Sequence, residues 1–248
     1  ACSLARTPLM SAQRVQAEVR EAATVVLLRR AEADASDPAP RIFMVRRSAR
    51  STFMPDTLVF PGGRVEPIDL DGDGQTDDSA FEAAAKRECL EECGVDLGAR
   101  DLTWFDTWKT PSGESPRRYL ARFYFAHLEA HEGEHAEADG EETEDGRWAT
   151  AAEHLAAWHR GEVDLPPPTL SILGRLESHG AAGFATGDGA ELRTPILPKV
   201  AAEEGTIAIL LPHDHLYDET DGDAAPCPVR AHQYPKRFLR RDDKWQTP

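Results

Sequence analysis

The sequence lacks any apolar run near the length of about 18 residues that a membrane-spanning helix requires. It also lacks the pattern of a secretory signal, because the opening stretch ACSLARTPLM has one arginine and no long apolar segment. The chain is otherwise typical of a globular protein, with 40% hydrophobic and 29% charged residues. These absences exclude a membrane-spanning protein, and we expect a cytoplasmic one.

Cysteine is scarce, with only four residues in 248: Cys2, Cys89, Cys93 and Cys227. None of their spacings is that of a paired zinc site, and four are too few for a disulfide framework. We therefore expect reduced thiols. Cys89 and Cys93 lie four residues apart, which predicts packing residues on one face of a helix.

Positive charge is also in deficit, with 28 lysines and arginines against 44 acidic residues and a net charge of -16. This balance excludes sequence-independent binding to nucleic acid, which draws its affinity from basic residues. An anionic substrate would need local help, either from metal cations or from clusters such as Arg46, Arg47 and Arg50, and Arg117 with Arg118. The sequence leaves both a monomer and a homodimer open.

The pattern of apolar, turn-forming and charged residues predicts alternating strands and helices without an internal repeat. We expect strands at 23–29, 41–47, 58–63, 102–108 and 119–128, helices at 80–93, 151–160 and 169–179, a strand and turn at 206–217, acidic loops at 66–79 and 129–146, and an irregular last 30 residues. Gly94 is expected to end the first helix in the left-handed conformation.

The helix at 80–93 ends in a cluster of charged residues. Residues three and four apart share one face of a helix, so Glu88, Glu91 and Glu92 can direct their carboxylates to one place, with Arg87 beside them. Such carboxylates repel each other unless a cation lies among them, and Mg²⁺ or Mn²⁺ is the natural partner. The alternative is an exposed charged helix without a ligand.

The residues around this helix favour the metal site. FPGG at 60–63 precedes the helix and predicts a tight turn with available carbonyl groups, and RECLEECGV follows at 87–95. This combination resembles the Nudix hydrolase superfamily, whose box runs Gly, five residues, Glu, seven residues, then Arg-Glu-apolar-x-Glu-Glu-x-Gly-apolar. Gly63 opens the box here, but an acidic insert widens it, and Ser79 stands eight residues before Arg87 in place of Glu.

The resemblance implies roles for the residues that match the box. Glu88, Glu91 and Glu92 would carry Mg²⁺ or Mn²⁺ with the carbonyl of Gly63, and Arg87 would orient a glutamate. The metals would neutralise diphosphate oxygens and activate a water, whose proton Glu88 would accept. A further ligand is expected from an acidic loop, where we rank Glu142 ahead of Glu141 and Glu144.

The same resemblance implies an α/β (α+β) fold, a Nudix-type α/β/α sandwich with a mixed sheet and a helical C-terminal extension. We expect the hydrolase domain at 18–160, with its acidic insert at 66–79. Residues 161–248 would form the extension, packed on the same domain.

A narrower resemblance, to the coenzyme A diphosphatase branch with an enlarged box, rests on several segments. They are RRS at 46–48, FPGG at 60–63, 110–125, 165–176 and 210–219. The branch's motif has Arg and Gly where Thr52 and Asp56 stand. This branch would cleave coenzyme A or acyl-coenzyme A to adenosine 3′,5′-bisphosphate and (acyl-)phosphopantetheine, with Arg47, Ser48, Arg117 and Arg118 binding the substrate. ADP-ribose, a nucleotide sugar or a dinucleoside polyphosphate are alternative substrates.

The acidic insert raises the question of a second metal site. Asp69, Asp71 and Asp73 alternate before Gly74, as in the first half of a calcium loop, and Asp77 is a further oxygen donor. Position twelve of that loop is Ala80 instead of glutamate, so a complete EF-hand is excluded. A partial Ca²⁺ site and a solvated acidic loop both stay open, as do a non-catalytic nucleotide-binding domain and a calcium-binding interaction module.

Overall fold

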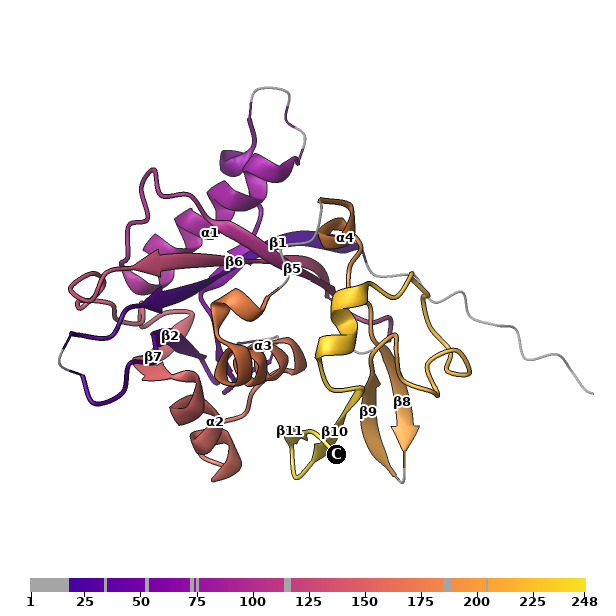
Figure 1. Ribbon diagram of the computed structural model, residues 1–248. Coiled ribbons are helices and arrows are strands. Elements are labelled where there is room, and N and C mark those ends of the chain that lie inside the picture. Colours follow the sequence, from indigo (N-terminus) through magenta and orange to yellow (C-terminus); the bar gives the residue numbers. More distant parts are fainter. Residues whose placement is uncertain are drawn as a thin grey trace, which may run out of the picture.

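The computed structural model describes residues 18–33, 35–51, 54–71, 74, 76–113, 117–184, 189–203 and 205–248. Within these residues the chain folds into three layers around a seven-stranded mixed sheet (Figure 1). The strands are β1 (Val19–Arg29), β2 (Arg41–Arg47), β3 (Leu58–Val59), β4 (Gly62–Arg64), β5 (Thr103–Lys109), β6 (Arg118–Leu128) and β7 (Thr143–Thr150). The predictions for Cys2 and Asp73 lie outside the described residues.

Strand β1 organises the main sheet. It pairs in parallel with β6 along its whole length, whereas β2 and β4 pair with it antiparallel. Ala22 to Thr24 face Gly62 to Arg64 of β4, and only Leu28 and Arg29 face β2. The glycines of the FPGG turn therefore lie beside the first half of β1, which β2 leaves unpaired.

Helix α1 (Asp78–Cys93) covers one face of the sheet. Asp77 caps its first turn by accepting a hydrogen bond from the Ala80 amide at 3.0 Å, and Gly94 ends it in the left-handed region with φ 68°. The apolar face that periodicity predicts is buried against β1, and it includes Phe81, Cys89 and Cys93. The prediction of two packing cysteines is thus confirmed.

The other face carries most of the remaining elements (Figure 1). It holds α2 (Ala151–His159), α3 (Pro167–His179), the short helical turns η2 (Ala181–Gly183) and η3 (Val229–Gln233), and a second sheet of β8 (Lys199–Glu203), β9 (Thr206–Leu210), β10 (Arg237–Arg241) and β11 (Lys244–Gln246). Helix α4 (Gly189–Arg193) lies beside the edge strand β5, and its Arg193 pairs with Asp78 at the start of α1. One hydrophobic cluster joins Val26 of β1 to Leu173 of α3 and Phe238 of β10. The C-terminal segment therefore shares its core with the main sheet.

Two sequence predictions were wrong in this region. The last 30 residues are not irregular, because β10 and β11 extend the second sheet beside β9. The loop predicted over 129–146 ends at Thr143, where β7 begins and pairs with β2. Both segments are rich in charged residues and take their strand form from pairing with a neighbour, which an apolar pattern does not reveal.

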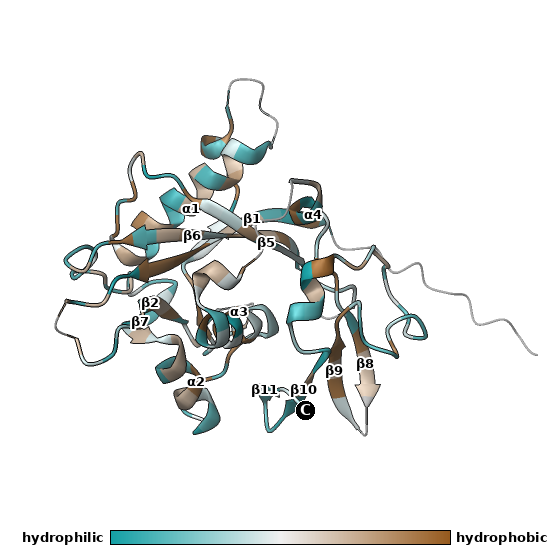
Figure 2. Cartoon of the chain, viewed as in Figure 1, coloured by the Kyte–Doolittle hydropathy of each residue, from teal (hydrophilic) through white to brown (hydrophobic). Residues whose placement is uncertain are grey.

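Hydropathy follows these layers. Hydrophobic residues gather on the strands, while the connecting loops are largely hydrophilic (Figure 2). Among the described residues, no helix combines the length and the apolar character needed to cross a membrane.

Candidate active site

A cleft of about 560 Å³ opens beside the first half of β1. Side chains alternate between the two faces of a strand, so Arg20, Ala22 and Thr24 of β1 line the cleft together. On β6 the same alternation brings Tyr119, Ala121 and Phe123 to it. Glu88 and Glu91 of α1, the start of α3 and Ile209 of the second sheet also line the cleft.

The two glycines of FPGG allow α1 to approach this cleft. A Cβ at Gly62 would overlap the backbone of Ala23 and Thr24, and a Cβ at Gly63 would overlap the carboxylate of Glu88. The Gly62 amide also donates a hydrogen bond to Glu92 at 2.9 Å. Glycine is therefore required at both positions for the turn to pack against the helix.

Arg87 organises the acidic end of α1. Its Nη1 donates to Glu88 at 2.9 Å and to Glu91 at 2.8 Å, and its Nη2 donates to the carbonyl of Arg64 at 2.9 Å. Its Nε and Nη2 form a forked pair with both oxygens of Asp69 at 3.0 and 2.9 Å. Such charge-assisted forks fix orientation as well as position.

Asp69 occupies the acidic position of the box, which counting back from Arg87 assigned to Ser79. It ends the short helical turn η1 (Pro67–Asp69), six residues after Gly63, which is the spacing of the acidic residue in the box. Ser79 instead bonds Asp71 and Asp77 at the start of α1. The inserted residues therefore come after Asp69 in the sequence, and the acidic residue of the box is still present. Counting six residues forward from Gly63 would have found it.

Of the three glutamates at the end of α1, Glu92 is buried and Glu88 is partly buried. The side chain of Glu88 is 14% exposed and Glu92 is 5% exposed, whereas that of Glu91 is 57% exposed. Burial raises the pKa of Glu88, despite the opposing effect of Arg87, and it raises the pKa of Glu92 to about 8. Glu92 thus lies where a carboxylate needs a nearby cation to stay ionised.

The predicted convergence of three carboxylates is met only in part. Among the described residues, no three His, Cys, Asp or Glu side chains form a cluster that could hold a metal ion. Arg87 draws Glu88 and Glu91 to itself, while Glu92 turns to the Gly62 amide. The donor chemistry nevertheless fits a hard divalent cation, since the charge of Glu142 contributes to the raised pKa of both Glu88 and Glu92.

The loop before β7 separates the three ranked glutamates. Glu142 lines the cleft, whereas the carboxylate of Glu144 accepts a hydrogen bond from Ser48 at 2.6 Å. Glu141 is exposed and does not line the cleft. Of these three glutamates, only Glu142 is among the described residues that line the cleft.

The four predicted substrate-binding residues divide into two pairs. Arg47 and Arg117 line the cleft. Ser48 is buried against Glu144, and Arg118 is 2% exposed, bonding the Thr110 carbonyl at 3.1 Å and Asp223 at 2.7 Å. Neighbours in a strand face opposite ways, so Arg117 and Arg118 do not reach the substrate side together.

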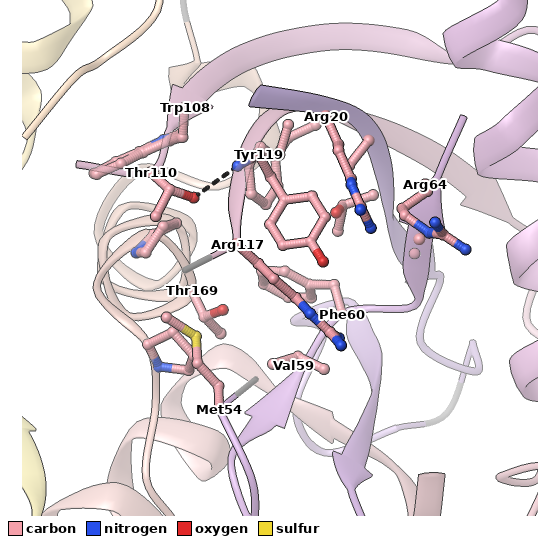
Figure 3. A pocket seen from close by; sticks show the side chains of 18 of the residues that line it. Arg20, Met54, Val59, Phe60, Arg64, Trp108, Thr110, Arg117, Tyr119 and Thr169 are labelled. Carbon is pink, nitrogen blue, oxygen red and sulfur yellow. Dashed lines mark hydrogen bonds between the residues drawn. The ribbon is translucent and has the colours of Figure 1, made fainter. Parts of the chain in front are cut away.

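Three further cations line the cleft without having been expected. Arg20 is the second residue of β1, Arg64 ends β4 and Lys109 ends β5. Figure 3 shows the guanidinium groups of Arg20, Arg64 and Arg117 on one side of the cleft and Trp108 and Thr169 on the other. Only strand pairing brings these cations together, although alternation along 19–29 could have assigned Arg20 and Thr24 to one face.

A buried hydrogen-bond network fixes the side chain of Trp108, which lines the cleft. The carboxylate of Asp106, which is fully buried, accepts hydrogen bonds from Trp108 Nε1 at 2.9 Å, Tyr234 Oη at 2.7 Å and Arg230 Nε at 2.7 Å. Arg230 belongs to η3 and Tyr234 follows it. The C-terminal segment thereby fixes a side chain of the cleft.

The residues of the predicted calcium loop have other partners. Asp69 pairs with Arg87, Asp71 accepts from Ser79, and Asp77 caps α1. A shared cation needs these oxygens turned to one point. Among the described residues of the insert, the geometry gives no support to the Ca²⁺ prediction.

Comparison with known proteins gives consistent matches. The model of the NUDIX domain matches residues 19–167. The Caenorhabditis elegans protein named "Putative nudix hydrolase 7" is 26% identical over 242 residues, covering 82% of this chain and 76% of that protein. The crystal structure of a NUDIX hydrolase from Alicyclobacillus acidocaldarius aligns with a TM-score of 0.52 at 22% identity, covering 72% of this chain and 97% of that one.

Proposed function

The chain belongs to the NUDIX family, whose hydrolases act on pyrophosphate bonds, and we propose that it cleaves the diphosphate linkage of a nucleotide derivative in the cleft beside β1. The observation that carries this proposal is that Glu88 and Glu142 line the cleft together with a rim of cations, while the buried Glu92 accepts a hydrogen bond from the amide of Gly62, which also lines the cleft. Phosphate oxygens need positive partners, and a hydrolytic water needs a base.

Mg²⁺ or Mn²⁺ would be held by Glu88, Glu92 and Glu142, with the Gly63 carbonyl and Glu91 completing the set. When bound, the ion would neutralise diphosphate oxygens and lower the pKa of a water. Glu88 accepts the proton of the attacking water, because its carboxylate lies in the cleft and Arg87 fixes its orientation. Arg87 is thus a positioning residue.

The cations of the rim bind the substrate. Arg20, Arg47, Arg64, Lys109 and Arg117 line the cleft from several different strands, so they can contact more than one phosphate group. We infer from this spread a substrate with a further phosphate, and coenzyme A or an acyl-coenzyme A is of this kind. Water would add across the linkage to yield adenosine 3′,5′-bisphosphate and (acyl-)phosphopantetheine.

A substrate panel tests both levels of the proposal. Coenzyme A, ADP-ribose, a nucleotide sugar and a diadenosine polyphosphate are assayed with Mg²⁺ and Mn²⁺ on the wild type, Glu88→Gln and Glu92→Gln. We expect losses of about 100-fold or more in kcat for both variants. Glu82→Gln is the matched control, since Glu82 lies on the same helix, pairs with Lys86 and does not line the cleft.

The outcomes separate the two levels. Turnover by Glu88→Gln and Glu92→Gln at the wild-type rate would refute the assignment of the carboxylates. Preferred cleavage of ADP-ribose, with coenzyme A unreacted, would refute the coenzyme A proposal and leave the diphosphate hydrolase in place.

A further inference from the structure

The connection that joins β5 to β6 carries several residues of the cleft. Its described residues are 109–113 and 117–119, here called the cleft turn. Those that line the cleft are Lys109, Thr110, Pro111, Arg117 and Tyr119. The Thr110 amide donates to the Tyr119 carbonyl at 2.9 Å, and the Tyr119 amide donates to the Thr110 hydroxyl at 3.1 Å (Figure 3). The position of the cleft turn therefore decides where the Arg117 guanidinium lies.

Arg118 anchors the cleft turn from outside the cleft. It follows Arg117 in the chain but does not line the cleft, and its side chain is 2% exposed. Its Nε donates to the Thr110 carbonyl at 3.1 Å, and its Nη2 forms an ion pair with Asp223 Oδ2 at 2.7 Å. A guanidinium buried to this extent needs a counter-charge, because little water reaches it. Asp223 supplies that charge from the C-terminal segment.

The loop that carries Asp223, here called the anchor loop, covers residues 214–223 and is fixed to the second sheet. The buried Lys199 of β8 donates from Nζ to the carbonyls of Tyr217 at 3.0 Å and Thr220 at 2.9 Å. The Tyr217 ring belongs to a hydrophobic cluster of the same sheet. Asp223 therefore extends from a rigid base.

A second contact joins the anchor loop to the cleft turn. The Asp223 amide donates to the Ser112 hydroxyl at 3.2 Å. A Cβ added at Gly222 would lie 3.3 Å from the same hydroxyl oxygen, so the two segments approach closely here. The anchor loop thus holds the cleft turn both through charge and through its backbone.

We propose that Asp223 is a positioning residue for substrate binding: its carboxylate holds Arg118, and Arg118 holds the cleft turn so that Arg117 meets a phosphate group of the substrate. Asp223 itself does not line the cleft. An arginine that extends from a fixed backbone loses less conformational entropy when it binds a phosphate than one on a mobile backbone. This inference rests on the proposed diphosphate hydrolysis and adds a residue of the C-terminal segment that determines substrate affinity.

Asp223→Asn tests this role, because it keeps the size of the side chain and the backbone contact but removes the charge that pairs with Arg118. We expect KM for the most rapidly cleaved compound of the panel to rise about tenfold, since one charge-assisted phosphate contact is weakened. The value of kcat should stay within about twofold, because the carboxylates of α1 are positioned by other contacts. Asp223→Glu restores the charge and should return KM to within about threefold of the wild type. Asp221→Asn, at an exposed residue of the same loop, is the matched control and should leave both constants unchanged.

A double-mutant cycle distinguishes positioning from a general loss of structure. In an Arg117→Met background, Asp223→Asn should raise KM no further, because the arginine that it positions is gone. A further rise as large as in the wild-type background would overturn the proposal, as would an unchanged KM in Asp223→Asn itself. If Asp223→Asn does not fold, Arg118→Met combined with Asp223→Asn leaves no buried charge unpaired and should show the same rise in KM.

Binding of ADP, measured by calorimetry with Mg²⁺, separates this inference from the proposed function. We expect Asp223→Asn to weaken ADP binding about tenfold. Absence of turnover with every compound of the panel would refute the proposed hydrolysis. An ADP Kd that is equal in the wild type and Asp223→Asn, or an absence of ADP binding by the wild type, would overturn the positioning role.

Discussion

Replacing Asp69 by asparagine should lower both the stability and the activity of the protein. Both oxygens of Asp69 accept hydrogen bonds from Arg87, at 3.0 and 2.9 Å, and Asp69 Oδ2 also accepts from the Glu66 amide at 2.8 Å. An asparagine has one oxygen for these three donors, and its NH₂ group would face another donor. Because the side chain of Asp69 is 3% exposed, water does not restore the lost partners.

The magnitude follows from the kind of bond removed. Breaking a charge-assisted fork between side chains this buried costs about 3 kcal/mol. For a chain of this size, that loss corresponds to a fall in Tm of about 6–12 °C. Arg87 would also lose the anchor that positions Glu88, so we expect kcat to fall about tenfold or more.

Urea denaturation and steady-state kinetics of Asp69→Asn measure these effects, with Ser79→Ala as the matched control. Ser79 is exposed, so its replacement should change the free energy of unfolding by less than about 0.5 kcal/mol. A double-mutant cycle with Arg87→Met should give a coupling of about 1–3 kcal/mol. The reasoning fails if Asp69→Asn is as stable as the wild type, or if Ser79→Ala loses as much stability and activity.

Three further predictions concern other parts of the structure. Gly63→Ala places a Cβ against the Glu88 carboxylate and should lower kcat/KM at least about tenfold with little change in the unfolding midpoint; unchanged kinetics would contradict the close approach. Arg230→Met leaves buried Asp106 without its cation and should cost about 3–5 kcal/mol in urea denaturation, whereas a loss below about 1 kcal/mol would show that the pair does not hold η3 to the main sheet. The pKa of Asp78 is lowered from 3.8 to about 2, mainly by the hydrogen bond from Arg193. The ionised carboxylate therefore contributes its full share of the free energy of unfolding above about pH 4–5, and this contribution disappears as the pH falls through about 2. The stability difference between the wild type and Asp78→Asn, measured by denaturation at each pH, should follow this course; a difference that persists at pH 1.5 would refute it.

Sequence patterns correctly predicted the elements that depend on residues close together in the sequence. The spacing of Phe81, Cys89 and Cys93 predicted the buried face of α1, and Gly94 predicted its end, because helix periodicity and capping depend on near neighbours. The acidic cluster of the same helix could be located for the same reason. The box also predicted that the FPGG turn and α1 contribute to one site, because it contains both segments and only the insert changes their spacing in the sequence.

Contacts between distant segments were not predictable in this way. The pairing of Asp69 with Arg87 crosses the insert, and counting back from Arg87 led to Ser79 instead. The joining of Arg20, Arg64 and Lys109 at one cleft depends on which strands pair with β1. In the second sheet, the apolar residues of β9 predicted a strand, whereas β10 and β11 have little apolar pattern and depend on pairing with their neighbours.

The sequence by itself determined an acidic helix with a defined apolar face and a glycine turn before it, because both are set by residues within a few positions of one another. Only the tertiary structure decided which carboxylates are buried, which arginines reach the cleft, and that prolines of the C-terminal segment line it. Those properties depend on the removal of water and on the packing of segments far apart in the chain, and no local spacing records them.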